Sequence, residues 1–221
     1  MKRILLFAVL TIPVFLLSMT QLKPRTILFF GDSITQQASN ENGFIRVLQA
    51  GLDAKNDKST QIINAGIGGN KVTDLYLRFN EDVLSKNPDE VVIWIGINDV
   101  WHSDRGVGTD LNKFGGFYQK MIDQLKAKNV KVTLCTPGVI GELNDHSNPH
   151  DGELNAFSKT IRKLAADNNL ELIDFRKSFY DYEVKNNTEN KRSGILTTDG
   201  VHLNPQGNHF VADIFKGALA L

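Results

Sequence analysis

Short apolar runs alternate with longer segments of helical spacing along most of this 221-residue chain. The runs predict five strands, at 26–30, 60–66, 90–96, 130–137 and 170–175. The helical segments lie at 43–55, 72–86, 111–129, 152–169 and 205–220. Nearly continuous apolar strands that alternate with helices indicate a parallel sheet covered on both faces. The pattern therefore predicts an α/β fold: a three-layer α/β/α sandwich with a central, mainly parallel, five-stranded sheet of flavodoxin-like order.

The N-terminal residues differ from the rest of the chain. Lys2 and Arg3 precede an apolar run at 4–17, which has about the length of a signal-peptide core. A membrane span needs roughly 20 apolar residues, and Pro13 interrupts this run. We expect residues 1–20 to be a signal peptide and the protein to be periplasmic or secreted, with no stable membrane span after leader removal. An uncleaved N-terminal anchor is the alternative. Residues 26–221 should form the functional domain.

Charge and cysteine content exclude several classes of protein. Lys and Arg together number 25, as do Asp and Glu, so no basic excess points to nucleic acid. Cys135 is the single cysteine, which excludes an intramolecular disulfide and a cysteine-based metal site. The zinc-hydrolase motif His-Glu-x-x-His is absent from the sequence.

The segments that follow the first four strands, and the segment before the last helix, hold the polar groups from which a site could be built. Ligands of open parallel sheets bind outside the carboxyl ends of the strands, so these segments should converge on one edge. The groups are, in chain order, Ser33, Gly68, Gly69, Asn98, Asp199 and His202. Together they supply a hydroxyl, a base, a group that orients the base, and donors for an oxyanion. This set of groups predicts acyl transfer.

Other motifs with similar residues do not fit. A dinucleotide fingerprint through Gly66 and Gly68 would need glycine where Lys71 stands, and the ending of a phosphate-binding loop is absent. The Gly-x-Ser-x-Gly elbow of α/β-hydrolases fails because Thr35 occupies its second glycine position.

The spacing of Asp199 and His202 is informative. Three residues apart on a short turn, the carboxylate can accept a hydrogen bond from one imidazole nitrogen while the other faces a nucleophile. A capping aspartate beside a surface histidine is the alternative interpretation of the pair alone.

Four separated blocks resemble the SGNH hydrolases, the GDSL-type esterases. "FGDSIT" resembles the first block of that family, "NAGIGGN" the second, "GIND" the third and "DGVHLN" the last. Their order and separations also match, and the resemblance runs from about residue 26 to 216. Ile34 stands in place of the leucine of the family name.

The resemblance implies a serine-dependent ester hydrolase without a metal or cofactor. Ser33 would be the nucleophile, His202 the general base and then the general acid, and Asp199 the residue that orients His202. The oxyanion hole would comprise the Ser33 backbone N–H, the Gly69 N–H and the Asn98 side chain, with Gly68 as the competitor of Gly69.

Three further residues are candidates for contact with substrate. Asp32 precedes the nucleophile, although hydrogen bonding within its own loop is the simpler role. Trp101 and His102 follow "GIND" and should reach the mouth of the cleft as part of its wall, with simple packing within their loop as the alternative.

Polar loops favour a short acyl group over a long-chain lipid. We therefore expect hydrolysis of short acyl esters, acetyl above all, of carbohydrates or small alcohols through an acyl-enzyme. The alternatives are a lysophospholipase or thioesterase-type lipid hydrolase, and a non-catalytic carbohydrate-binding protein on the same scaffold.

Overall fold

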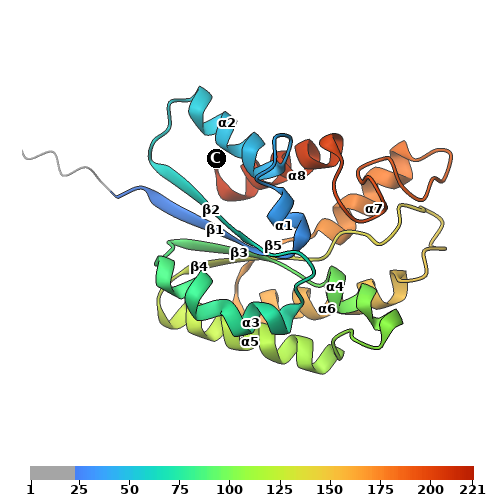
Figure 1. Cartoon of the computed structure of the whole chain (residues 1–221), viewed down its shortest axis with the longest axis horizontal. Helices are drawn as coiled ribbons and strands as arrows, with labels where there is room; N and C mark the ends of the chain where they lie inside the picture. The colour runs from blue at the N-terminus through green and yellow to red at the C-terminus, as the bar shows by residue number, and fades with distance from the viewer. Residues whose placement is uncertain (1–22) are drawn as a thin grey trace, which may run out of the picture.

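A sheet of five parallel strands forms the middle layer of the molecule (Figure 1). The structure is a computed structural model that describes residues 23–221, so the predicted signal peptide at 1–20 lies outside the described residues. The strands are β1 (Arg25–Gly31), β2 (Thr60–Gly66), β3 (Glu90–Trp94), β4 (Lys131–Cys135) and β5 (Glu171–Ile173). Their order, β2-β1-β3-β4-β5, is the predicted flavodoxin-like order.

Helices cover both faces of this sheet. They are α1 (Ser33–Gln37), α2 (Phe44–Ala54), α3 (Val72–Asp82), α4 (Ile97–Trp101), α5 (Leu111–Ala127), α6 (Asp151–Asn168), α7 (Phe175–Asn186) and α8 (Pro205–Leu219), with short 3-10 helices at Leu84–Lys86 and His102–Arg105. Figure 1 shows α2 and α8 on one face and α3, α5 and α6 on the other. The predicted three-layer α/β/α sandwich is therefore confirmed.

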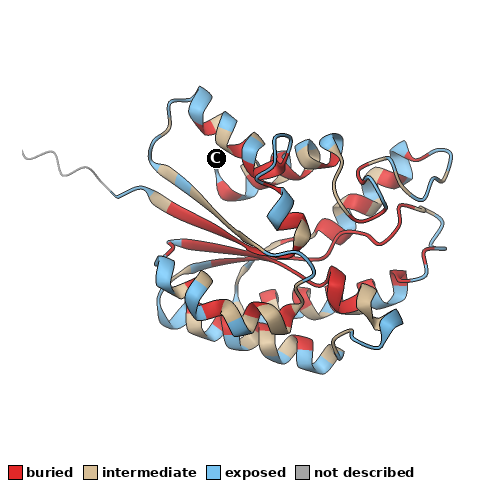
Figure 2. Cartoon of the chain, in the orientation of Figure 1, coloured by how far each residue is buried: buried red, intermediate tan, exposed pale blue. Residues whose placement is uncertain are grey.

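The core lies on both sides of β1, β3 and β4, whose residues are almost all buried (Figure 2). Under α2 and α8, Phe29 packs against Phe44 and Phe215 with ring centroids 5.6 and 5.0 Å apart. Trp94 stacks on Phe175 at 4.3 Å. Such aromatic pairs stabilise a core beyond their buried area alone. This packing fixes the carboxyl ends of β1 and β3, from which the site is built.

The structure contains helices that the apolar pattern did not predict. Both α1 and α4 are one-turn helices of five residues, too short for periodicity to reveal. The segment predicted as one helix at 72–86 is α3 to Asp82, followed by the 3-10 helix Leu84–Lys86. Strand β3 ends at Trp94, two residues before its predicted end. Gly96, with a φ of 132°, already belongs to the turn into α4.

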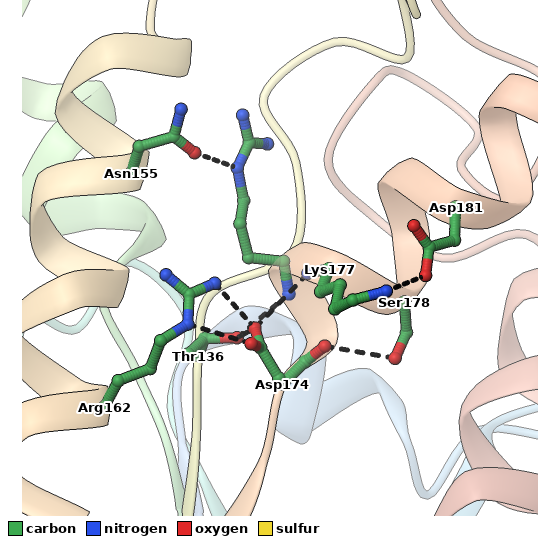
Figure 3. A network of polar contacts seen from close by, with 8 residues as sticks. Thr136, Asn155, Arg162, Asp174, Lys177, Ser178 and Asp181 are labelled. Atoms are coloured by element: carbon green, nitrogen blue, oxygen red, sulfur yellow. Dashed lines mark hydrogen bonds and ion pairs between the residues drawn. The ribbon is translucent and has the colours of Figure 1, made fainter.

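Helix α7 was also not predicted, because polar side chains predominate along it. Its first turn is held by Asp174, whose carboxylate accepts from Thr136 Oγ1 at 3.0 Å and from Arg162 Nε at 2.8 Å (Figure 3). The same carboxylate accepts from the backbone N–H of Lys177, as an N-cap does. Polar contacts from α6 and from the residue that follows β4 thus fasten this helix at the edge of the sheet.

No helix within residues 23–221 is both long and apolar enough to cross a membrane.

Candidate active site

Ser33 and Asn98 lie at the point where the strand order of the sheet reverses. The chain runs from β1 outward to β2 and then returns to β3 on the other side of β1. Ser33 follows β1 directly, and Asn98 lies in α4 just after β3. In open α/β sheets, the crevice outside the carboxyl ends at such a switch point is where ligands bind.

The turn that carries Ser33 depends on close backbone packing. Asp32 caps α1 by accepting the Ile34 N–H at 3.0 Å, so Ser33 becomes the first helical residue. Gly31 and Gly66 pair across β1 and β2. A Cβ on Gly31 would lie 2.5 Å from the Trp94 carbonyl oxygen, and one on Gly66 would lie 2.2 Å from the Gln36 nitrogen. The two glycines therefore let α1 lie directly against the strand ends.

The structure brings together the predicted serine, histidine and aspartate. Ser33 Oγ lies 2.9 Å from His202 Nε2, and His202 Nδ1 lies 2.8 Å from Asp199 Oδ2. Asp199 Oδ1 also accepts the backbone N–H groups of Val201 and His202, at 2.9 and 2.8 Å. Partial burial raises the pKa of Asp199, but the hydrogen bonds from His202 and these N–H groups outweigh it and hold the pKa below its usual value. An ionised Asp199 favours the Nδ1–H tautomer of His202.

Glu142 supports the turn that carries Asp199 and His202, and sequence reasoning missed it. This fully buried carboxylate accepts the backbone N–H groups of Ile195, Leu196 and Thr197 at 2.6–2.8 Å. In addition, the Gly141 N–H donates to the carbonyl of Gly200 at 2.8 Å. The segment after β4 therefore anchors the loop before α8, although no local sequence pattern links the two.

The two glycines after β2 differ in whether their backbone N–H groups are hydrogen-bonded. Gly68 N–H donates to Gln36 Oε1 at 3.1 Å, whereas Gly69 N–H has no partner among the described residues. Gly69 also has a φ of +76°, and a Cβ added there would meet nothing within 4 Å. Gly69 rather than Gly68 therefore has an N–H available to a ligand.

The side-chain amide of Asn98 makes one hydrogen bond within residues 23–221 and keeps a second N–H free to donate. Its side chain is buried, and Nδ2 donates to the Asn70 carbonyl at 3.0 Å. An amide nitrogen carries two N–H groups, so a second donor is left. The Ser33 N–H, in the first turn of α1, has no partner in the described part of the chain either.

Arg78, on α3, fastens the same region and was not singled out from the sequence. Its Nε donates to Asn70 Oδ1 at 2.7 Å, while Nη1 and Nη2 donate to the carbonyls of Ala65 and Gly31, each at 2.9 Å. The guanidinium also lies 4.4 Å from the centroid of the Phe30 ring. Arg78 thereby joins the end of β1, the end of β2 and the residue that binds Asn98.

Asp32 was a candidate for contact with substrate, with hydrogen bonding in its own loop as the simpler role. Its side chain is only 2% exposed and faces the loop that it caps. Burial raises its pKa to about 7, against the opposing effect of the Ile34 N–H. Asp99 is buried beside it, and burial raises the pKa of that carboxyl to about 6. The loop role considered for Asp32 is therefore the one the geometry supports.

Trp101 and His102 lie where α4 passes into the next 3-10 helix, and both are half-buried. Trp101 packs against the hydrophobic core. Burial and the nearby Arg105 guanidinium lower the pKa of His102. Within residues 23–221, no group of three or more His, Cys, Asp or Glu side chains could hold a metal ion.

Comparisons with known proteins found a matching family and several similar proteins. The model of the GDSL-like lipase/acylhydrolase family matches residues 29–210. An acetylxylan esterase from Geobacillus stearothermophilus is 27% identical over 206 residues, which cover 86% of this chain and 91% of that protein. An uncharacterized lipoprotein, YqeF, from Bacillus subtilis (strain 168) is 26% identical over 169 residues, covering 68% and 70%. The crystal structure of an acetyl xylan esterase, AlAXEase, is 56% identical with a TM-score of 0.87, covering 88% of this chain and 99% of that one.

Proposed function

The chain belongs to the GDSL-like lipase/acylhydrolase family, and on that premise we propose that it is a serine-dependent acetylesterase acting on acetylated xylan and its oligosaccharides. It is a carboxylic ester hydrolase of the SGNH type, and its acetylxylan esterase relatives support acetyl esters of carbohydrates as its substrates. The observation that carries the proposal is the 2.9 Å approach of Ser33 Oγ to His202 Nε2.

The proposed reaction begins with attack of Ser33 Oγ on the acetyl carbonyl carbon. His202 Nε2 takes the hydroxyl proton as the bond forms, and Asp199 stabilises the resulting imidazolium. Negative charge develops on the carbonyl oxygen, where the N–H groups of Ser33 and Gly69 and the Asn98 amide would donate hydrogen bonds.

The intermediate then collapses to an acetyl-enzyme. The ester C–O bond breaks, and His202 donates its proton to the sugar oxygen, which leaves as the free alcohol. A water molecule, deprotonated by His202, attacks the acetyl-enzyme, and acetate leaves as Ser33 regains its proton.

Export is a further part of the proposal. The lipoprotein among the relatives is consistent with an exported family member, and an extracellular location suits a polymeric substrate. We propose that residues 26–221 are the hydrolase domain and that residues 1–20 direct export. Expression of the full chain and mass measurement of the mature protein test this: an intact N-terminus on a cytoplasmic product contradicts it.

Substrate choice is tested by comparing acetylated xylo-oligosaccharides with p-nitrophenyl acetate, butyrate and octanoate. We expect acetate release from the oligosaccharides, and a kcat/KM that falls as the acyl chain lengthens. Faster hydrolysis of octanoate than of acetate contradicts the short-acyl assignment. Failure to release acetate from any acetylated sugar contradicts the carbohydrate assignment.

A further inference from the structure

A small polar cleft of about 230 Å³ is lined by residues next in the chain to Asp199 and His202 and by Gln37, one helical turn from Ser33. One wall comes from the last residue of α1 and the loop that connects it to α2. The other comes from the loop before α8 and the first turn of α8. The cleft is smaller than the roughly 300–1,000 Å³ typical of pockets for drug-sized ligands, so it suits a compact group such as a single ring.

Each wall of the cleft belongs to a chain segment that also carries a residue of the candidate triad. Gln37 lies four residues after Ser33 on α1, and residues at this spacing share one face of a helix. On the other wall, Thr198 and Leu203 flank the turn that carries Asp199 and His202. The Thr198 N–H donates to the His202 carbonyl at 2.7 Å, which closes that turn. The cleft therefore lies on the side of Ser33 and His202 from which the chain segments that carry them continue.

The second wall is rigid because its carboxamides are already engaged. Asn208 Oδ1 accepts the Phe44 N–H at 2.9 Å, and Asn204 Oδ1 accepts the Gly207 N–H at 2.8 Å. The side-chain nitrogen of Asn204 also donates to the Ile195 carbonyl at 3.2 Å. These bonds tie α2, α8 and the loop before α8 together, so the cleft has a preformed floor.

The first wall presents free carboxamides instead. The side chains of Gln37, Asn40 and Asn42 are exposed and make no side-chain hydrogen bond within the described residues. Each carboxamide offers both a donor and an acceptor, as a sugar hydroxyl requires. Leu203 and Pro205 add apolar surface for the C–H face of a ring. The one charged group in the lining is Glu41, which disfavours an anionic ligand.

The proposed chemistry places the sugar on this side of Ser33. His202 must protonate the leaving oxygen, so the alcohol part of the ester lies next to His202, whose neighbours line the cleft. We propose that the cleft is a subsite for a neutral sugar ring, which binds a residue of the glycan beyond the acetylated one. This inference rests on the proposed function.

The test compares two substrates in the full-length protein carrying Gln37→Ala and Asn42→Ala together. Acetylated xylo-oligosaccharide can fill the cleft, whereas p-nitrophenyl acetate carries no sugar. Each lost neutral hydrogen bond weakens binding roughly two- to tenfold. We expect the kcat/KM for the oligosaccharide, divided by that for p-nitrophenyl acetate, to fall about tenfold or more. The matched control is Gln61→Ala with Asn80→Ala, two exposed carboxamides outside the cleft, and should keep the wild-type ratio.

A binding measurement separates failure of the subsite from failure of the proposed function. Unacetylated xylotriose should inhibit p-nitrophenyl acetate hydrolysis competitively, with a KI raised about tenfold in the cleft variant and unchanged in the control. One result overturns the subsite alone: the wild-type protein hydrolyses acetylated oligosaccharides, but the cleft variant keeps the wild-type ratio of kcat/KM values and the wild-type KI. Another result overturns the carbohydrate function and the subsite together: the wild-type protein hydrolyses p-nitrophenyl acetate but neither hydrolyses nor binds xylo-oligosaccharides.

Discussion

Ser33 Oγ and His202 Nε2 lie 2.9 Å apart although 169 positions separate the two residues in the chain. The approach depends on two independent supports. The α1 turn seats Ser33 on the ends of β1 and β2, while Glu142 holds the loop that carries His202. Substitution of the residues that support Ser33 and His202 should therefore change activity, as should substitution of the residues that would touch a substrate.

Asn98→Ala should lower kcat about 10²–10³-fold with little change in KM. It removes one donor to the charge that develops on the carbonyl oxygen, and losses of this kind fall mainly on the transition state. Steady-state kinetics with p-nitrophenyl acetate measure the effect. The exposed Asn112→Ala serves as the control. A kcat for Asn98→Ala within a factor of ~10 of wild type would contradict the oxyanion assignment.

Arg78→Gln should lower kcat roughly 10- to 100-fold and reduce the free energy of unfolding by about 1–3 kcal/mol. The change removes the Arg78 donors from the carbonyls of Gly31 and Ala65, although Gly31 still accepts the Ile67 N–H at 3.1 Å. It also releases Asn70, which holds Asn98. Arg78→Lys keeps the charge but not the forked donors, so it should restore stability more than kcat. Chemical denaturation and kinetics together provide the measurement.

The control for Arg78 is Arg46→Gln, whose exposed guanidinium makes no side-chain hydrogen bond within residues 23–221. Loss of stability in Arg78→Gln with an unaltered kcat shows that Arg78 supports the fold without positioning Asn98.

Glu142→Gln should destabilise the protein by about 2–3 kcal/mol and lower kcat. A carboxylate accepts three backbone N–H groups at this position, whereas a carboxamide would turn an NH₂ group toward one of them. Thermal unfolding and p-nitrophenyl acetate hydrolysis test the effect against Glu171→Gln, an exposed glutamate on β5. Wild-type stability in Glu142→Gln disproves the anchoring role.

Asp32→Asn should change how stability depends on pH. The unfolded chain ionises this carboxyl near its ordinary pKa of 3.8, whereas burial raises the pKa of Asp32 to about 7 in the folded protein. Between these values the folded protein keeps a proton that the unfolded chain has lost, so stability falls as the pH rises through the window. Asparagine still accepts the Ile34 N–H but does not ionise. Between about pH 5 and about pH 8, the free energy of unfolding of the variant should therefore rise by about 2–3 kcal/mol relative to that of wild type. Urea unfolding of both proteins at both pH values measures this, and an equal stability difference at the two pH values would refute it.

The sequence was most informative where a local pattern and a topological rule coincide. Strand β2 was predicted with its observed bounds, Thr60–Gly66. The strand-end rule placed Ser33 and Asn98 at one edge of the sheet. The approach of Asp199 and His202 to Ser33 was predicted from their three-residue spacing and from the family resemblance.

Arg78 and Glu142 could not be found in that way. Arg78 binds backbone carbonyls 13 and 47 positions away, and Glu142 binds N–H groups 53–55 positions away. Any residue type offers such backbone groups, so their positions leave no trace in the sequence. The burial of Asp32 was equally hidden, because it follows from how closely α1 packs on the strand ends.

The central claim, that Ser33 is the nucleophile, is tested most directly by comparing wild type with Ser33→Ala in p-nitrophenyl acetate hydrolysis. The intact mass of each protein is measured during turnover. We predict loss of activity by about 10³-fold or more in Ser33→Ala, and a transient acetyl adduct on the wild type alone. Equal rates for the two proteins, or an acetyl adduct on Ser33→Ala, would contradict the account.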